Sequence, residues 1–152
     1  MEQIDKLIKK DQNQVLIFAC KAHVPFGFAS HAWFVINKKG NLSRWEVRHY
    51  RNKKNPEWGH VFLNELPPFA GIGTFYVLKG FPRRVEFIGS ADDSEIAEKM
   101  MECIENSPNS YPYRERYFPT GPNSNTYIQW VLSKFKEAGI PLAGKFIGKG
   151  YK

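Results

Sequence analysis

Dense apolar runs alternate with short polar stretches along the first third of the chain. Residues 15–23 are apolar, β-branched and aromatic, which predicts a buried strand rather than an amphipathic helix. Residues 31–37 and 42–50 flank a turn at 38–41. In the second of these arms apolar and charged positions alternate with the period of a half-buried strand. We therefore expect a buried strand followed by a β-hairpin.

The middle of the chain carries weaker patterns. Residues 51–71 are polar and then proline-rich, which indicates a long loop with a short helix or strand near 60–66. Two further apolar runs, 72–79 and 83–89, are split by Gly80-Phe81-Pro82 and predict two more strands.

Helical spacing dominates the last third. Ser90 to Asp93 is expected to open a helix that continues to about Asn106, because acidic residues stand in its first turn and apolar residues recur at helical intervals. A second helix is expected from about Ser124 to Ala138, ending at Gly139. The order of elements predicts an α+β domain in which a small antiparallel sheet packs against two main helices.

The 152 residues are enough for one core, so the whole chain, 1–152, is interpreted as a single domain. Its first thirteen residues are charged and are expected to form a loosely ordered N-terminal segment. They contain no apolar signal core, and no stretch is long and apolar enough to span a bilayer. Cys20 and Cys103 are the two cysteines, which favours reduced thiols and a cytoplasmic location.

The net charge is +7. Such a balance attracts nucleic acid, anionic lipid or acidic substrates without specificity. No metal and no cofactor are expected. Cys20 and His23 would lie on opposite faces of a strand, and no paired zinc-ligand spacing follows them. The glycines at 71–73 and 144–150 match neither a dinucleotide fingerprint nor a phosphate loop.

Asn123, Ser124 and Asn125 lead directly into the second predicted helix. Asparagine and serine are preferred helix caps, so one interpretation is capping alone. Three consecutive residues of this type exceed what one helix start requires. The second interpretation is that Ser124 is a nucleophile at the positive end of the helix, with His31 at the start of a strand as its base. Both interpretations stay open at this point.

The preceding segment, YPYRERYFPTGPN, alternates aromatic rings with Arg114 and Arg116. Rings beside guanidinium groups are typical of sites that bind single-stranded nucleic acid. Alternatively, Tyr111, Tyr113 and Tyr117 pack this segment against the sheet, or the segment lines a substrate cleft that leads to Ser124.

Taken together, HAWFVIN, SRWEVRHY, YPYRERY, GPNSNTY and the closing GKFIGKGY resemble a bacterial family labelled as domain of unknown function number 3750. The resemblance runs from about His31 to Tyr151, and GPNSNT is its most specific part. Tyr127 stands where the family often has phenylalanine, and the ending KFIGKGY departs from the usual AIGKDY-like pattern. Membership implies no activity, because the family has none assigned.

The order of polar residues also resembles, more distantly, the circularly permuted papain-like proteins, which include NlpC-type peptidases and lecithin-retinol acyltransferases. That resemblance implies a papain-like architecture with His31 as base, Ser124 in the position of the usual cysteine, and Glu46, or else His49, as the group that orients the base. Apart from this resemblance, the candidate substrate-binding residues are Asn123 and Asn125, which would shape the turn, together with Trp33, Tyr113, Arg114 and Arg116.

The serine changes the expected mechanism, because a hydroxyl must lose its proton to His31 during attack. The expected activity is hydrolysis or acyl transfer on an amide or ester of a small molecule, peptide or lipid. The alternative is a catalytically inactive module that binds an anionic ligand or nucleic acid.

Overall fold

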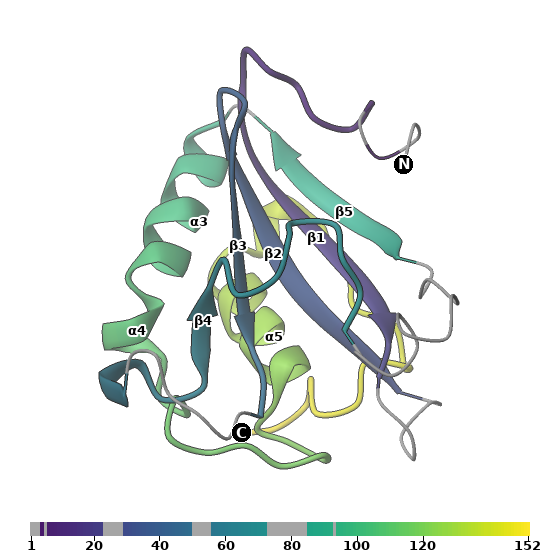
Figure 1. The fold of residues 1–152 in the computed structure, drawn as a ribbon, viewed down its shortest axis with the longest axis vertical. Helices are drawn as coiled ribbons and strands as arrows, with labels where there is room; N and C mark the ends of the chain where they lie inside the picture. Colours follow the sequence, from purple (N-terminus) through teal and green to yellow (C-terminus); the bar gives the residue numbers. More distant parts are fainter. Residues whose placement is uncertain (1–3, 5, 23–28, 50–55, 73–84, 93) are drawn as a thin grey trace.

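The computed structural model describes residues 4, 6–22, 29–49, 56–72, 85–92 and 94–152. Within these residues, five strands form one antiparallel sheet in the order β4-β3-β2-β1-β5. The strands are β1 (Asn13–Lys21), β2 (Ser30–Lys38), β3 (Asn41–Val47), β4 (Val61–Leu63) and β5 (Glu86–Asp92). The helices are α3 (Glu95–Glu105), the short α4 (Ser107–Ser110) and α5 (Ser124–Lys134), with 3-10 turns η1 (Pro56–Trp58) and η2 (Lys136–Ala138). The predicted α+β class is confirmed (Figure 1).

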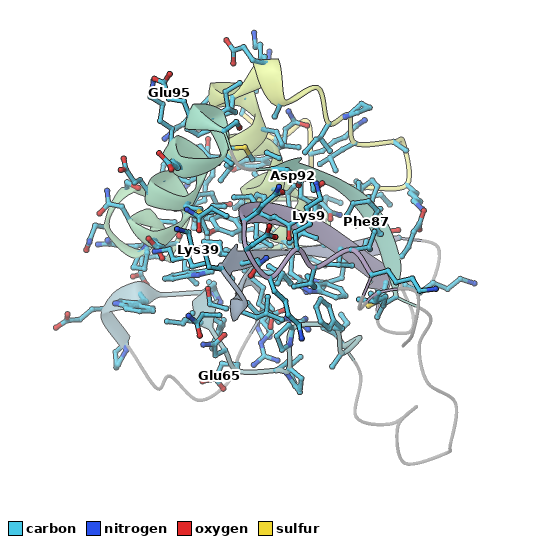
Figure 2. The ribbon with its side chains drawn as sticks, turned by 90° about the horizontal axis from the view of Figure 1, so that it is seen from above. Lys9, Lys39, Glu65, Phe87, Asp92 and Glu95 are labelled. Carbon is cyan, nitrogen blue, oxygen red and sulfur yellow. The ribbon has the colours of Figure 1, made fainter. Side chains whose placement is uncertain are left out.

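Both faces of the sheet are covered. On one face, alternate residues of β1 and β2, such as Ile17 and Phe34, join α3 and α5 in the main core. On the other face, Phe18 and Trp33 belong to a second core with Phe69. Figure 2 shows the two sides, with the helices above the sheet and the segment that carries Glu65 below it. Burial on both faces explains why the two strands read as continuous apolar runs.

The register leaves part of β2 without a strand neighbour on one side. β2 pairs with β1 along its whole length, from Ser30↔Lys21 to Lys38↔Asn13. The ladder between β2 and β3 ends at Phe34↔Trp45. Within the ladders that the structure describes, residues 30–33 therefore have a free edge on the side of β3. The candidate site lies at this end of β2.

The expected helix start at Ser90 to Asp93 is wrong. Residues up to Asp92 continue β5, because they pair with β1 as far as Gln14↔Asp92. The Gln14 side-chain amide also donates to Asp92 Oδ1 at 3.2 Å. The helix instead starts at Glu95, where the Ser94 side chain caps it by accepting from the Ala97 N–H. Pairing with a distant strand outweighs the local helix signal.

The remaining predicted elements have simple outcomes. The short element expected near 60–66 is the strand β4. The strand expected at 72–79 lies outside the described residues from position 73 onward.

In the N-terminal segment, Leu7 and Ile8 pack against the second core. Of the helices described, none is long and apolar enough to cross a membrane. Both cysteines are free thiols.

Candidate active site

The N-terminus of α5 begins with a side-chain cap. Asn123 is the N-cap residue, and its Oδ1 accepts from the N–H groups of Asn125 and Thr126 at 3.0 and 3.2 Å. In return, Thr126 Oγ1 accepts from the Asn123 N–H at 3.1 Å, which completes a capping box. The predicted capping role of this stretch is therefore present, and Asn123 performs it.

The same stretch also binds the C-terminal tail. The Asn123 and Asn125 side-chain amides both donate to the Ile147 carbonyl, at 3.1 and 2.8 Å. The Thr126 hydroxyl donates to the Gly148 carbonyl at 2.7 Å. Asn125, which one helix start does not require, is thus explained by a second task that it shares with Asn123 and Thr126, which is holding the tail.

Ser124 is the exception among these four residues. It is 2% exposed. In the part of the chain that the structure describes, its hydroxyl makes no hydrogen bond. A hydroxyl without a hydrogen-bond partner at a helix N-terminus is a candidate for chemistry.

The α5 N-terminus and the tail replace β3 along the free edge of β2. The Ser30 N–H donates to the Lys145 carbonyl at 3.1 Å. The Ser30 carbonyl accepts from the Asn125 side-chain amide at 2.8 Å. These bonds bring the start of α5 to the residue directly before His31. Alternation along β2 places the His31 ring on the Trp33 face of the sheet, whereas the body of α5 packs with Phe34 on the opposite face. Ser124 and His31 therefore approach each other only around the end of β2 at Ser30.

His31 is held by a buried carboxylate. Its Nε2 lies 3.0 Å from Glu46 Oε2, and the two side chains are 3% and 1% exposed. Burial alone would raise the pKa of Glu46, but the hydrogen bond from His31, the charge of its imidazolium form and the charge and hydrogen bond of Arg44 lower it to about 2. An ionised carboxylate only accepts hydrogen bonds, so His31 Nε2 carries the proton of this bond. In the neutral ring this leaves the Nδ1 lone pair free, and no hydrogen bond to Nδ1 is seen among the described residues.

Arg44 completes the buried group. Its Nη2 donates to the same Glu46 oxygen at 2.9 Å, and the side chain is fully buried. The guanidinium lies over the Trp33 ring, 4.1 Å from its centre. Burial lowers the pKa of Arg44, and the charge of Glu46 opposes this effect. Sequence reasoning missed Arg44, although its spacing of two from Glu46 on an alternating strand places both on one face.

Residues 64–72, which we call the covering segment, close this face of the sheet. Arg44 Nη1 donates to the carbonyls of Pro67, at 3.0 Å, and Ala70. The Trp33 indole N–H donates to the Pro68 carbonyl at 2.8 Å. Trp33 is fully buried and stacks beside His31, with ring centres 6.0 Å apart. Its position suits support of the His31 ring better than the predicted direct contact with substrate.

The family model described as protein of unknown function (DUF3750) matches residues 12–151, which include His31, Glu46 and Ser124. The chain belongs to this family. No curated protein matches the sequence, and no solved structure matches the fold. The match establishes the family and assigns no activity to it.

The aromatic segment before α5 packs mainly inward in this DUF3750 protein. Tyr111 is 2% exposed and meets the rings of Tyr127 and Trp130 edge-on. Tyr117 packs against His49 and His60. Base stacking needs exposed ring faces, so these contacts favour the packing interpretation over nucleic-acid binding.

The other predicted contact residues of this segment lie nearer the surface. Tyr113 is half-buried and meets the Tyr151 ring edge-on at 5.1 Å. Arg114 Nη1 donates to the Pro108 carbonyl at 2.7 Å, which commits this side chain to the fold. Arg116 is exposed. Of the three, Arg116 is best placed to meet a ligand from solvent.

The alternative orienting group, His49, belongs to a different cluster. Its ring stacks on His60, with centres 5.9 Å apart, whereas His31 is bonded to Glu46. Among the described residues no group of three or more His, Cys, Asp or Glu side chains is arranged to hold a metal ion. The described residues therefore assemble an imidazole, a carboxylate and a guanidinium, and the start of α5, which carries Ser124, is bound to the residue before His31.

We expect acid to destabilise the protein through Glu46. The pKa of Glu46 in the folded protein, about 2, lies below its ordinary value of 4.5. Its stabilisation is therefore complete above pH 4.5 and is lost as the pH falls toward 2. At about 1.4 kcal/mol for each pH unit, this contribution is about 3 kcal/mol. Urea unfolding across this range measures the loss, and the Glu46 carboxyl carbon signal in NMR identifies its source. A Glu46 titration midpoint near 4.5 would contradict the prediction.

Proposed function

We propose that this protein hydrolyses, or transfers the acyl group of, an amide or ester, with Ser124 as nucleophile, His31 as base and Glu46 as the group that orients the base. The observation that carries the proposal is the buried 3.0 Å hydrogen bond between His31 and Glu46, made beside the free edge of β2. The N-terminus of α5, with the uncommitted hydroxyl of Ser124, reaches that same edge through Asn125.

The proposed reaction follows from these groups. Ser124 Oγ attacks the acyl carbon while its proton passes to His31 Nδ1. The tetrahedral intermediate collapses, and the amine or alcohol leaves with the proton from His31. A water or an acceptor alcohol then attacks the acyl-enzyme, gives its proton to His31 and releases the product. The proton on His31 returns to Ser124.

The helix start also suits a developing oxyanion. Asn123 Oδ1 accepts from the N–H groups of Asn125 and Thr126. The N–H of Ser124 itself is left as a donor at the positive end of α5. A backbone N–H next to the nucleophile is the usual first donor to the negative oxygen formed in acyl transfer.

The papain-like resemblance supports the same assignment. In permuted papain-like proteins the base opens a strand, its orienting group lies on the next strand, and the nucleophile opens a later helix. Here His31 lies at the start of β2, Glu46 on β3 and Ser124 at the start of α5. We extend the proposal to a papain-like architecture acting on a small-molecule, peptide or lipid substrate, in the cytoplasm.

A fluorophosphonate probe tests the proposal. We expect the wild-type protein to be labelled on Ser124, as located by peptide mass spectrometry. Ser124→Ala should abolish labelling, and His31→Ala should slow it by about 100-fold or more, because the base is lost. Ser133→Ala is the matched control, since Ser133 lies on the same helix with its hydroxyl bonded to the Trp130 carbonyl.

The opposite result would favour the alternative class. If folded wild-type protein is not labelled, or is labelled equally in Ser124→Ala, the catalytic proposal fails. The protein is then better described as an inactive binding module for an anionic ligand or nucleic acid, with exposed Arg116 as the first residue to test.

A further inference from the structure

The serine at position 124 requires a particular charge state of its base. A cysteine nucleophile works as a thiolate beside an imidazolium, so a positively charged histidine suits it. A serine hydroxyl cannot be ionised in this way and needs an uncharged imidazole that accepts its proton. The groups around His31 decide which state is favoured.

We propose that Arg44 balances the negative charge of Glu46, so that His31 remains an uncharged base of the kind that a serine nucleophile requires. The inference rests on the proposed function of Ser124 and adds a positioning residue to it. His31 Nε2 and Arg44 Nη2 bond the same oxygen, Glu46 Oε2, at 3.0 and 2.9 Å. The carboxylate therefore has two basic neighbours, one of which is charged at every working pH.

The net charge of the buried side chains explains why His31 would stay uncharged. Arg44 and Glu46 are 0% and 1% exposed, and together they carry no net charge. A proton added to His31, itself 3% exposed, would leave one uncompensated positive charge in the same buried group. An uncompensated buried charge is strongly unfavourable. Without Arg44, the same proton would instead complete a neutral pair with Glu46.

The other groups facing this site do not change the balance. Arg48 Nε lies 3.8 Å from Glu46 Oε1 and adds further positive charge. Glu65, on the covering segment, lies 3.8 Å from Arg48 Nη2 and offsets that residue. Cys20 of β1 lies opposite His31. The phenol of Tyr117 stays neutral, because burial and then the charge of Glu46 raise its pKa.

Arg44 is also fixed in place. Its Nη1 donates to two carbonyls of the covering segment, Pro67 and Ala70, and its plane lies over Trp33. These contacts hold the guanidinium at Glu46. A rigid partner of this kind biases the charge state of His31 continuously.

A thiol introduced at the nucleophile position reports that charge state without requiring turnover. In a Cys103→Ser background, Ser124→Cys is combined with Arg44→Met, and alkylation of the new thiol by iodoacetamide is followed near pH 6 by peptide mass spectrometry. We expect Arg44→Met to accelerate alkylation by about tenfold or more, because His31 then becomes an imidazolium that stabilises the thiolate. Arg48→Met is the matched control and should change the rate less than about twofold, because Arg48 makes no hydrogen bond to Glu46.

The outcomes separate the two proposals. Adding His31→Asn should remove the acceleration. If alkylation is independent of His31 in every background, the two positions do not meet, and both the proposed function and this inference fail. If His31 accelerates alkylation equally with and without Arg44, the inference fails while the proposed function stands.

A second measurement covers the case in which Arg44→Met does not fold. Nitrogen-15 NMR of the histidine rings in the unmodified protein near pH 7 should show His31 with a proton on Nε2 and none on Nδ1. Arg44→Lys, which keeps the charge, should preserve this pattern. A doubly protonated His31 in the wild-type protein would overturn the inference.

Discussion

Replacing Glu46 with alanine is expected to lower the free energy of unfolding by about 3 to 5 kcal/mol, because it leaves a buried guanidinium without its carboxylate. Arg44 is 0% exposed and its Nη2 bonds Glu46 at 2.9 Å. The remaining acceptors are carbonyls of the covering segment, which carry no charge. Urea unfolding monitored by circular dichroism gives the free energy directly.

The matched control is Glu95→Ala. Glu95 lies only 2.6 Å from Lys99, a shorter ion pair than that of Arg44, but the two side chains are 80% and 60% exposed. Water and salt screen such a pair, so we expect a change within the error of the measurement. A loss below about 1 kcal/mol for Glu46→Ala would show that Arg44 finds other compensation and would contradict the prediction.

Replacing Gly148 with alanine is expected to cost about 3 kcal/mol, because the new methyl group would collide with the cap of α5 in a strained backbone conformation. Gly148 has φ +91, and a Cβ there would lie 2.5 to 2.8 Å from the side-chain amide of Asn123. That amide cannot move freely, since it binds Pro119, Ile147 and the first turn of the helix.

Gly150→Ala is the matched control for this substitution. Gly150 is two residues away in the same tail, and nothing lies within 4 Å of a Cβ built there. We expect its thermal unfolding midpoint to stay at the wild-type value. If Gly148→Ala were equally stable, the tail would not be bound to the α5 cap as described.

Much of the sheet and the second helix follows from local sequence. The apolar run in β1 and the hairpin of β2 and β3 are strong signals, because two-sided burial and a tight turn both act over short distances. Asn123 marks the start of α5 through its own side chain. The hairpin also brings Glu46 to His31, which are fifteen positions apart.

Local sequence patterns gave a wrong prediction, or none, where contacts with a distant segment of the chain determine the structure. Acidic residues near Asp92 favour a helix start, but pairing with Gln14 keeps Asp92 in β5. The tail carbonyls of Ile147 and Gly148 carry no side-chain signal, so their role at α5 is invisible in the sequence. In the sequence Arg44 resembles an ordinary surface arginine. Only the structure shows that the covering segment buries it.

From its sequence alone this protein can be assigned an α+β fold, a capped α5 and the residue types of a candidate site. These features follow from helix propensity, hydrophobic periodicity and helix capping, which depend on residues that are close in the sequence. Only the tertiary structure decided which polar side chains already have hydrogen-bond or ion-pair partners. Burial and long-range pairing hold Asn123, Asn125 and Thr126 against the tail and place Arg44 on Glu46. Within the part of the chain that the structure describes, Ser124 is left with a hydroxyl that has no partner, because hydrogen-bond partners are assigned by three-dimensional packing and not by sequence order.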